Sequence, residues 1–268
     1  MPKQTVTLMI IDPQVDFCSP TGSLYVTGAE NDSARLAKMI EKNIGDIDDI
    51  HVTLDSHHLV HIAHPIFWVD SMGKHPTPFT LISADDVRKG KWMAFNPGYR
   101  QRAKEYVEKL EINARYPLVI WPPHCLIGSQ GAAIMPEIFE QLISWESQFA
   151  IVNKVPKGSN PFSEHYSAVR ADVEDPADPT TMLNTDLIRR LQNIGDQKIL
   201  IAGQALSHCV ANTVRDIAKE LDPAQVKNIV LLEDACSNVS TFEKMGQDFI
   251  TELVALGMQV STTDKFFA

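Results

Sequence analysis

Short apolar runs rich in β-branched residues recur along the chain, and their spacing constrains the fold more than any other feature. Helical patterns lie between most of these runs. Because the runs show no polar alternation, they are typical of a parallel sheet that is covered by helices on both faces. The sequence therefore predicts an α/β fold with strands near residues 5–12, 49–55, 149–155, 198–203, 227–234 and 258–263.

The alternation of strands and helices loosens between residues 68 and 117, where prolines are frequent. A chain of 268 residues is long enough for one large domain with an insertion. We therefore expect a single domain over residues 1–268, with an insertion or lid at about 68–117.

The charge balance bears on possible partners. There are 34 Asp and Glu residues against 24 Lys and Arg, a formal net charge of -10, and no basic run. This argues against a nucleic-acid or anionic membrane partner and favours a small ligand. No apolar stretch approaches the ~20 residues of a membrane span, and the first strand pattern leaves no room for a signal peptide. We expect a cytoplasmic protein, and a homo-oligomer is compatible with these features.

Reactive side chains lie near the carboxyl ends of the predicted strands. Asp12 and Asp55 end the first two strands, Lys154 and Lys157 follow the apolar residues 149–152 of the third, and Cys209 follows the fourth. In an open parallel sheet this edge is where ligands bind. The sequence thus predicts that these residues form one site.

Cys209 follows the break at Gly203 and stands where a helical pattern begins. A helix N-terminus favours the thiolate, so we expect a lowered thiol pKa and a nucleophile, although most free cysteines are merely small buried residues. His208 is its neighbour, but successive helical residues point about 100° apart and do not face each other. Asp12 and a lysine from another strand can instead take the proton and stabilise the thiolate.

The segment 54–65 is rich in groups that bind metals. In an extended chain Asp55 and His57 project to the same face, which suits two ligands of one ion. His124 lies in the proline-rich WPPHC motif, and the histidines at 61 and 64 are spare candidates. Imidazole and carboxylate suit Zn²⁺, Fe²⁺ or Mn²⁺. The alternative is an ordinary polar loop.

Five motifs appear in order between residues 8 and about 215: IIDPQVDF, TLDSHH, WPPHC, KGSNPFSEHYSA and GQALSHCV. This set resembles the nicotinamidase branch of the isochorismatase-like cysteine hydrolases. The resemblance implies a three-layer fold with a six-stranded, mainly parallel sheet. It also implies a Cys–Asp–Lys triad, one divalent metal ion and hydrolysis of nicotinamide to nicotinic acid and ammonia.

The resemblance carries functional roles onto particular residues. The triad falls on Asp12, Cys209 and a lysine, for which motif matching favours Lys157 over Lys154, although Lys154 follows the apolar run more directly. The metal ligands fall on Asp55, His57 and His124, and the family spacing D-x-H-x3-H favours His61 over His64 as a fourth. Zinc is the first choice of ion, with iron and manganese as alternatives.

The resemblance also describes the pocket. Phe17, Trp121 and Tyr166 match the aromatic walls that would hold a flat ring. The backbone N–H groups of Ala205 and Cys209 would form the oxyanion hole, after a cis peptide bond between residues 204 and 205.

One departure from the family pattern lies just before the nucleophile. The family usually reads Ala-Thr-Asp, whereas here Ala205 is followed by Leu206 and Ser207. The pocket can therefore differ, so an amidase for another small carbamoyl or ureido amide is the nearest alternative. A catalytically silent metal-binding scaffold is the alternative from a different class.

Overall fold

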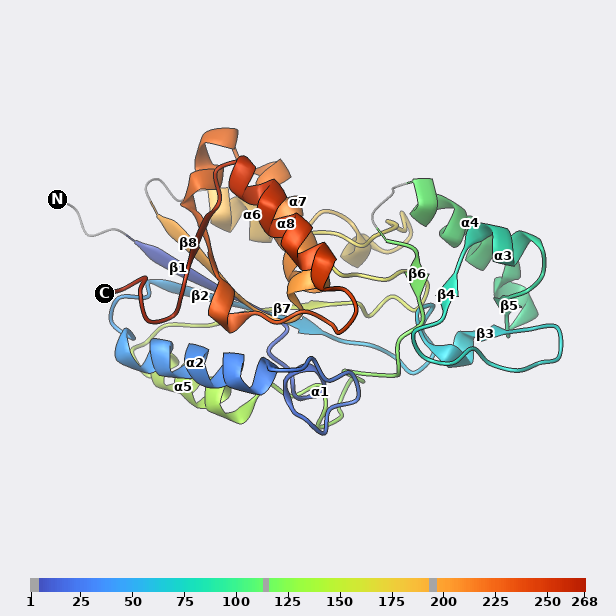
Figure 1. Cartoon of the computed structure of the whole chain (residues 1–268), viewed down its shortest axis with the longest axis horizontal. Helices are drawn as coiled ribbons and strands as arrows, with labels where there is room; N and C mark the ends of the chain where they lie inside the picture. Colours follow the sequence, from blue (N-terminus) through green and yellow to red (C-terminus); the bar gives the residue numbers. More distant parts are fainter. Residues whose placement is uncertain (1–4, 113–115, 193–196) are drawn as a thin grey trace.

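The central element of the computed structural model, which describes residues 5–112, 116–192 and 197–268, is a six-stranded sheet (Figure 1). Its order is β10-β9-β8-β1-β2-β7, and every neighbouring pair is parallel. The strands are β1 (Val6–Ile11), β2 (Asp49–Asp55), β7 (Asn153–Lys157), β8 (Lys198–Gly203), β9 (Ile229–Leu232) and β10 (Gln259–Ser261). The predicted six-stranded parallel sheet is confirmed.

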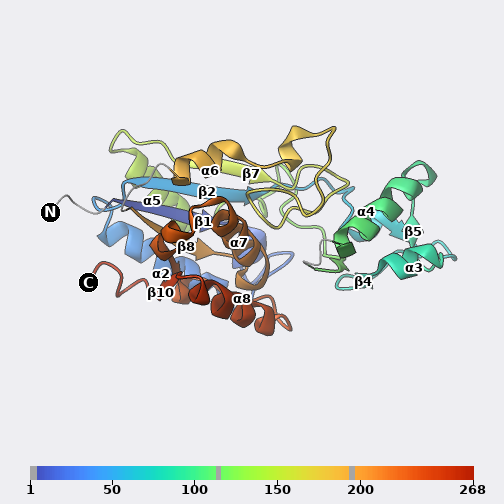
Figure 2. The same ribbon diagram turned by 90° about the horizontal axis from the view of Figure 1, so that it is seen from above.

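Helices cover both faces of this sheet (Figures 1 and 2). One face carries α2 (Ala29–Lys42) and α5 (Pro136–Glu146), which pack against each other. The other face carries α6 (Thr185–Gln192), α7 (Ala211–Glu220) and α8 (Glu243–Ala255). Helix α1 (Val15–Cys18) is a single turn after β1. None of the described helices combines the length and apolar character that a membrane span requires.

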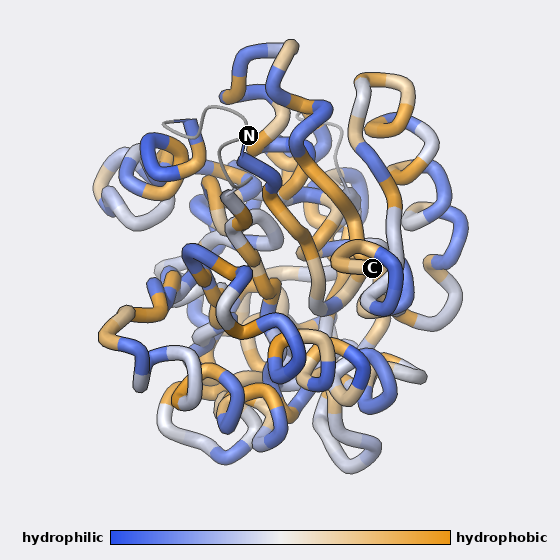
Figure 3. The backbone as a smooth tube through the Cα atoms, turned by 90° about the vertical axis from the view of Figure 1, so that its left-hand side faces the viewer, coloured by the Kyte–Doolittle hydropathy of each residue, from blue (hydrophilic) through white to orange (hydrophobic). Residues whose placement is uncertain are grey.

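Burial on both faces explains the apolar runs in the sequence. All six residues of β1 and all four of β9 are buried. The strands accordingly appear as continuous hydrophobic segments in Figure 3, whereas the surrounding helices alternate between hydrophobic and hydrophilic residues. Side chains from both faces of the sheet thus form the core.

Strand β7 lies later in the chain than the apolar run at residues 149–155 suggests. It begins at Asn153 and ends at Lys157, while Phe149 and Ile151 are exposed. The reason lies in the tertiary structure. Strand β7 is an edge strand, and its pairing with β2 from His51 to Asp55 sets its register. The expected strand is present, but its end moves to Lys157.

The described residues of the expected insertion form a small lobe. It contains two antiparallel pairs, β3 (Trp68–Val69) with β5 (Met93–Ala94) and β4 (Leu81–Ile82) with β6 (Leu118–Val119). Helices α3 (Ala84–Arg88) and α4 (Arg100–Ile112) complete it. In Figures 1 and 2 the lobe lies beyond the end of the sheet toward which the strand arrows point. It is therefore on the side of the sheet where ligands bind in parallel folds.

The end of β8 requires a glycine. Gly203 has φ of +114°, and a Cβ added there would lie 2.0 Å from the backbone oxygen of Ile11. We expect Gly203→Ala to lower the free energy of unfolding by at least ~2 kcal/mol, because the strained conformation and the clash add. Urea denaturation of the variant measures this loss.

The matched control is Gly45→Ala. A Cβ at Gly45 meets nothing within 4 Å, so this variant should change the free energy of unfolding by less than ~1 kcal/mol. Equal urea midpoints for both variants would show that the close approach at Gly203 is tolerated.

Candidate active site

Four reactive residues from four neighbouring parts of the sheet meet at its carboxyl edge. Asp12 directly follows β1, Asp55 ends β2 and Lys157 ends β7. Cys209 lies in the π-helical segment η4 (Leu206–Val210) between β8 and α7. Because β8, β1, β2 and β7 are consecutive in the sheet, their ends bring these side chains together.

Lys157 is the centre of this group. Its Nζ lies 2.9 Å from Asp12 Oδ2, 3.1 Å from Asp55 Oδ1 and 3.6 Å from Cys209 Sγ. It also donates to the backbone oxygen of His165 at 3.0 Å. The side chain is only 1% exposed, so these contacts are made away from solvent.

Lys154 lies elsewhere. Its side chain is 43% exposed, and its Nζ is 3.8 Å from a carboxylate oxygen of Glu146. Side chains alternate between the two sides of a strand, so two lysines separated by three positions point to opposite sides. The structure therefore brings Lys157, and not Lys154, to the other reactive residues.

Asp12 is held in one orientation. Its backbone N–H donates to Thr53 Oγ1 at 3.0 Å, and that hydroxyl donates to Asp12 Oδ1 at 2.5 Å. The second carboxylate oxygen is left for Lys157. Burial raises the pKa of Asp12, Lys157 acts in the opposite direction, and the nearby Asp55 raises it further. A carboxylate with a raised pKa accepts a proton more readily.

The pKa of the Cys209 thiol differs from the expectation. It is raised well above its usual value by burial, although Lys157 lowers it; Asp12 and Asp55 raise it again. The predicted lowering of this pKa by a helix N-terminus is wrong. A buried thiol that lies beside two carboxylates keeps its proton. The local sequence around Cys209 does not contain these carboxylates, which come from other strands.

The backbone before Cys209 turns sharply. The peptide bond between Gln204 and Ala205 is cis, as the family resemblance implies. The N–H groups of His208 and Val210 both donate to the backbone oxygen of Ala205, at 3.0 and 3.1 Å. The side chain of Gln204 anchors this turn, because its Nε2 donates to Asp32 Oδ2 at 2.9 Å.

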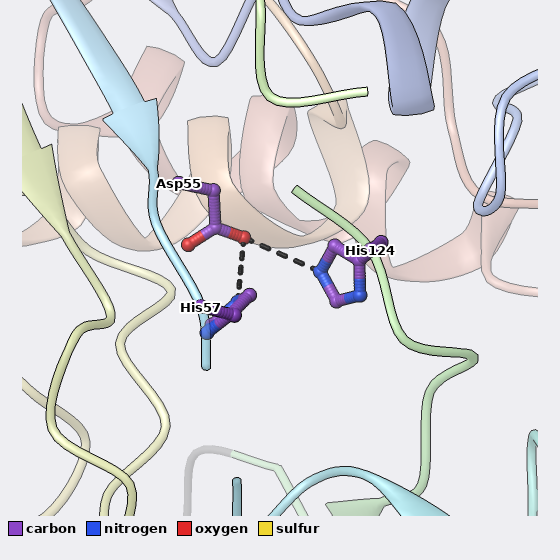
Figure 4. A group of neighbouring side chains, drawn as sticks. All are labelled: Asp55, His57 and His124. Atoms are coloured by element: carbon purple, nitrogen blue, oxygen red, sulfur yellow. Dashed lines mark hydrogen bonds and ion pairs between the residues drawn. The ribbon is translucent and has the colours of Figure 1, made fainter. Parts of the chain in front are cut away.

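Beside the reactive group lies a candidate metal centre (Figure 4). His57 Nε2 is 3.0 Å and His124 Nε2 is 3.3 Å from Asp55 Oδ2. The potential ligand atoms of Asp55, His57 and His124 all lie within 4.8 Å of one another, and no other such group occurs in the described parts of the chain. Two imidazoles and one carboxylate are a donor set that suits Zn²⁺ or Fe²⁺.

The charge of Asp55 and the space left by a neighbouring glycine both suit this centre to a cation. Burial alone would raise the pKa of Asp55, but His57 and Lys157 hold it well below its usual value, so the carboxylate is ionised. Gly158 has φ of +84°, and a Cβ there would lie 2.8 Å from both Asp55 Oδ1 and His57 Cε1. The glycine after Lys157 therefore leaves room for the two ligands.

His61 is not brought into this group. Its Nε2 lies 3.2 Å from the backbone oxygen of Ser163, and its Nδ1 accepts the N–H of Ala63 at 3.2 Å. Both ring nitrogens are thus engaged with backbone. The family spacing that favours His61 as a ligand does not correspond to a free nitrogen here.

The three aromatic residues expected in the pocket wall are all buried. The Phe17 ring lies 5.3 Å from the ring of His124, and Trp121 Nε1 donates to the hydroxyl of Tyr166 at 2.9 Å. His208 joins them, with its ring 5.3 Å from that of Trp121 and 5.4 Å from that of Tyr166. No local sequence pattern indicated these aromatic surroundings of His208.

Two residues of the IIDPQVDF motif support the metal centre through hydrogen bonds that no sequence pattern indicated. Gln14 clamps the backbone of Asp55, since its Oε1 accepts the N–H at 2.7 Å and its Nε2 donates to the carbonyl at 2.8 Å. Asp16 Oδ2 accepts the N–H of Cys125, the residue after His124, at 2.7 Å. In the sequence these residues appear only as polar side chains shortly after a predicted strand. In the structure both are buried, and a buried polar group usually has a specific hydrogen-bond partner.

Comparisons with known proteins agree with this architecture. A family model described as the isochorismatase domain matches residues 167–265. The nicotinamidase of Saccharomyces cerevisiae is 24% identical over 213 residues, which are 80% of this chain and 81% of that protein. The chain is thus similar to isochorismatase-like hydrolases in its sequence. Among these hydrolases the similarity is to nicotinamidases, which supports the predicted class of enzyme, an amidohydrolase.

Solved structures of this family share the fold. The yeast nicotinamidase bound to the inhibitor nicotinaldehyde has a TM-score of 0.64 at 20% identity, covering 96% of this chain and 100% of that one. An Acinetobacter nicotinamidase/pyrazinamidase has a TM-score of 0.65 at 20% identity, covering 98% and 99%. The pyrazinamidase of Pyrococcus horikoshii in complex with zinc has a TM-score of 0.57 at 19% identity, covering 97% and 99%.

Proposed function

We propose that this isochorismatase-like hydrolase is a nicotinamidase, which converts nicotinamide to nicotinic acid and ammonia. The observation that carries the proposal is the contact of one buried ammonium, Lys157 Nζ, with both Asp12 Oδ2 and Cys209 Sγ. A nucleophile, a base and a cation in mutual contact are the parts that cysteine-dependent amide hydrolysis needs.

The first half of the reaction uses all three residues. Asp12 takes the thiol proton, helped by its raised pKa, and Lys157 stabilises the thiolate that forms. The sulfur then attacks the carboxamide carbon and forms a C–S bond, while the negative charge moves to the carbonyl oxygen. The N–H groups of Ala205 and Cys209 stabilise that oxyanion.

The second half regenerates the enzyme. The C–N bond breaks as Asp12 returns its proton to the leaving nitrogen, so ammonia departs and a thioester remains on Cys209. Asp12 then accepts a proton from a water molecule, whose oxygen attacks the thioester carbon. Cleavage of the C–S bond releases the carboxylic acid, and the thiol recovers its proton.

Asp55, His57 and His124 would hold one divalent metal ion. Their donor set and the zinc complex of the Pyrococcus relative support zinc as the first choice, with iron and manganese as alternatives. When bound, such an ion supplies a Lewis acid that can hold a ring nitrogen of the substrate. Because Lys157 contacts both Asp55 and Cys209 Sγ, the residues that would hold the ion lie next to the nucleophile.

The walls of the pocket support a flat heteroaromatic substrate. All three are buried: Phe17 lies against the metal-ligand candidate His124, and Trp121 and Tyr166 lie against His208 of η4. Stacking against such rings would orient a pyridine ring. The yeast relative, whose structure contains nicotinaldehyde, binds a ring of this shape.

One observation favours a second candidate, a related amidase for another small amide. Ser207, which stands where the family usually has aspartate, has its Oγ 2.9 Å from His208 Nδ1. The hydroxyl also accepts the N–H of Val239 at 3.1 Å. This replacement changes the hydrogen bonding of a histidine that contacts two pocket walls, and can thereby change which amide fits.

Ammonia release from a panel of amides tests the proposal. We expect kcat/KM to be highest for nicotinamide, lower for pyrazinamide and at least ~100-fold lower for aliphatic carbamoyl and ureido compounds, because these lack a ring to stack and orient. A coupled assay for ammonia measures all of them under one set of conditions.

The outcomes separate the candidates. A preference for a carbamoyl or ureido compound would replace nicotinamide as the substrate but keep the triad. A protein that binds metal and releases no ammonia from any amide in the panel would support the silent scaffold instead.

A further inference from the structure

The side chain of Gln204 is buried and uses both of its polar groups. Its Nε2 donates to Asp32 Oδ2 at 2.9 Å, and its Oε1 accepts the backbone N–H of Ser237 at 3.1 Å. A carboxylate only accepts hydrogen bonds and a backbone N–H only donates, so the two partners together fix the orientation of the amide. Gln204 thus bridges helix α2, which carries Asp32, and the segment after β9, which carries Ser237.

The backbone around Gln204 is held as well. Its own N–H donates to the backbone oxygen of Ile11 at 2.8 Å. The N–H of Leu206 donates to the backbone oxygen of Ser237, also at 2.8 Å. Between these two anchors lies the peptide unit that joins Gln204 to Ala205, and a peptide unit is planar. The direction of the Ala205 N–H, one of the two groups assigned to the oxyanion hole, therefore depends on how residues 204 and 206 are held.

The partner of Gln204 on α2 is a buried carboxylate. The side chain of Asp32 is 4% exposed, and its other oxygen, Oδ1, lies 2.6 Å from Arg35 Nη2. Arg35 in turn donates through Nε to the backbone oxygen of Asp234 at 2.6 Å. Burying a carboxylate costs free energy unless it is paired, and Arg35 supplies the pair. Hydrogen bonds to a charged acceptor are stronger than neutral ones, so Asp32 holds the Gln204 amide firmly.

We propose that Gln204 and Asp32 are positioning residues for amide hydrolysis, which aim the N–H of Ala205 at the oxyanion. This inference rests on the mechanism of the proposed function. The two side chains act through the backbone and take no part in bond making. Because the negative oxygen forms only after the sulfur has attacked, their effect belongs to the transition state and not to substrate binding.

Exchanging the amide and the carboxylate tests this inference. Gln204→Glu puts an oxygen in place of the donor that faces Asp32 Oδ2, so repulsion should displace the backbone and lower kcat ~100-fold with little change in KM. Asp32→Asn should cost less than ~10-fold, because the new amide oxygen still accepts from Gln204. The double variant should return to within ~10-fold of wild type, since the new asparagine donates to the new glutamate. The substrate is the amide that the wild-type chain hydrolyses fastest.

Labelling of Cys209 by iodoacetamide separates positioning from general damage. Alkylation of the sulfur forms no oxyanion, so its rate in Gln204→Glu should stay within ~5-fold of wild type. Gln247→Glu, the same change at an exposed residue of α8, is the matched control and should keep kcat within ~2-fold. Circular dichroism checks folding. If Gln204→Glu does not fold, Gln204→Met, which removes both hydrogen bonds without adding charge, should lower kcat at least ~10-fold with unchanged labelling.

Each outcome is decisive. Wild-type kcat in the folded Gln204 variant, or a double variant no more active than Gln204→Glu, would overturn this inference and leave the proposed function intact. Labelling that falls in parallel with turnover would give the two residues a structural role only, which also overturns it. A wild-type chain that releases no ammonia from any amide would overturn it together with the proposed function.

Discussion

Replacing Cys209 by alanine should abolish ammonia release from every amide that the wild-type chain hydrolyses. The loss should be ~1,000-fold or more, as for other enzymes that lose their nucleophile. The reason is that no other thiol contacts both Lys157 and Asp12 in the described structure. A continuous ammonia assay at saturating substrate measures the residual rate.

The control is Cys18→Ala, which removes another buried thiol outside the group around Lys157. It should retain activity within ~10-fold, because only packing changes. Thermal unfolding of both variants checks that they are folded. Residual turnover above about a hundredth of wild type in Cys209→Ala would exclude the thiol as the nucleophile.

Replacing Lys157 by methionine should produce the second large effect. The ammonium of Lys157 is the group that lowers the pKa of Cys209, whereas burial, Asp12 and Asp55 raise it. Without the cation the thiolate forms only at higher pH, so labelling of Cys209 by iodoacetamide should shift to higher pH. Turnover should fall with it, because the nucleophile stays protonated.

The same variant should also be less stable, with a defined dependence on pH. Removing one partner of a buried ion pair costs roughly 3–5 kcal/mol, since Asp12 and Asp55 are left without their cation. In the wild type Asp55 has a lowered pKa, so its contribution to stability is present above the unfolded pKa and is lost as the pH falls. The penalty in Lys157→Met should therefore be largest near neutral pH and shrink as the carboxylates take up protons in acid.

Lys154→Met is the matched control from the same strand. Its side chain is 43% exposed and its Nζ lies 3.8 Å from Glu146, so the free energy of unfolding should change by less than ~1 kcal/mol. Its labelling profile should match the wild type. A shift in Lys154→Met and none in Lys157→Met would reassign the catalytic lysine to residue 154.

Much of the architecture was determined by the sequence itself. The apolar runs require burial on both faces, which only a parallel sheet between two layers of helices provides. The reactive residues follow those runs, so their meeting at one edge of the sheet could be predicted without coordinates. For the same reason Asp12, Asp55 and Cys209 were identifiable as one group.

Which of the two lysines lies beside Asp12 and Cys209 depends on tertiary structure, although motif matching already favoured Lys157. Both lysines follow the apolar residues 149–152, but pairing with β2 extends β7 to Lys157. Strand alternation then sends Lys154 to the opposite side. Register on an edge strand depends on its partner, which is distant in sequence.

The properties of individual atoms were likewise decided by the fold. The raised pKa of Cys209 comes from burial and from carboxylates that follow β1 and β2. Whether His61 has a free ring nitrogen depends on which backbone groups face its ring. A sequence pattern specifies which residue types alternate along the chain, whereas desolvation and hydrogen bonding depend on distances between segments far apart in it, and those distances exist only once the chain has folded.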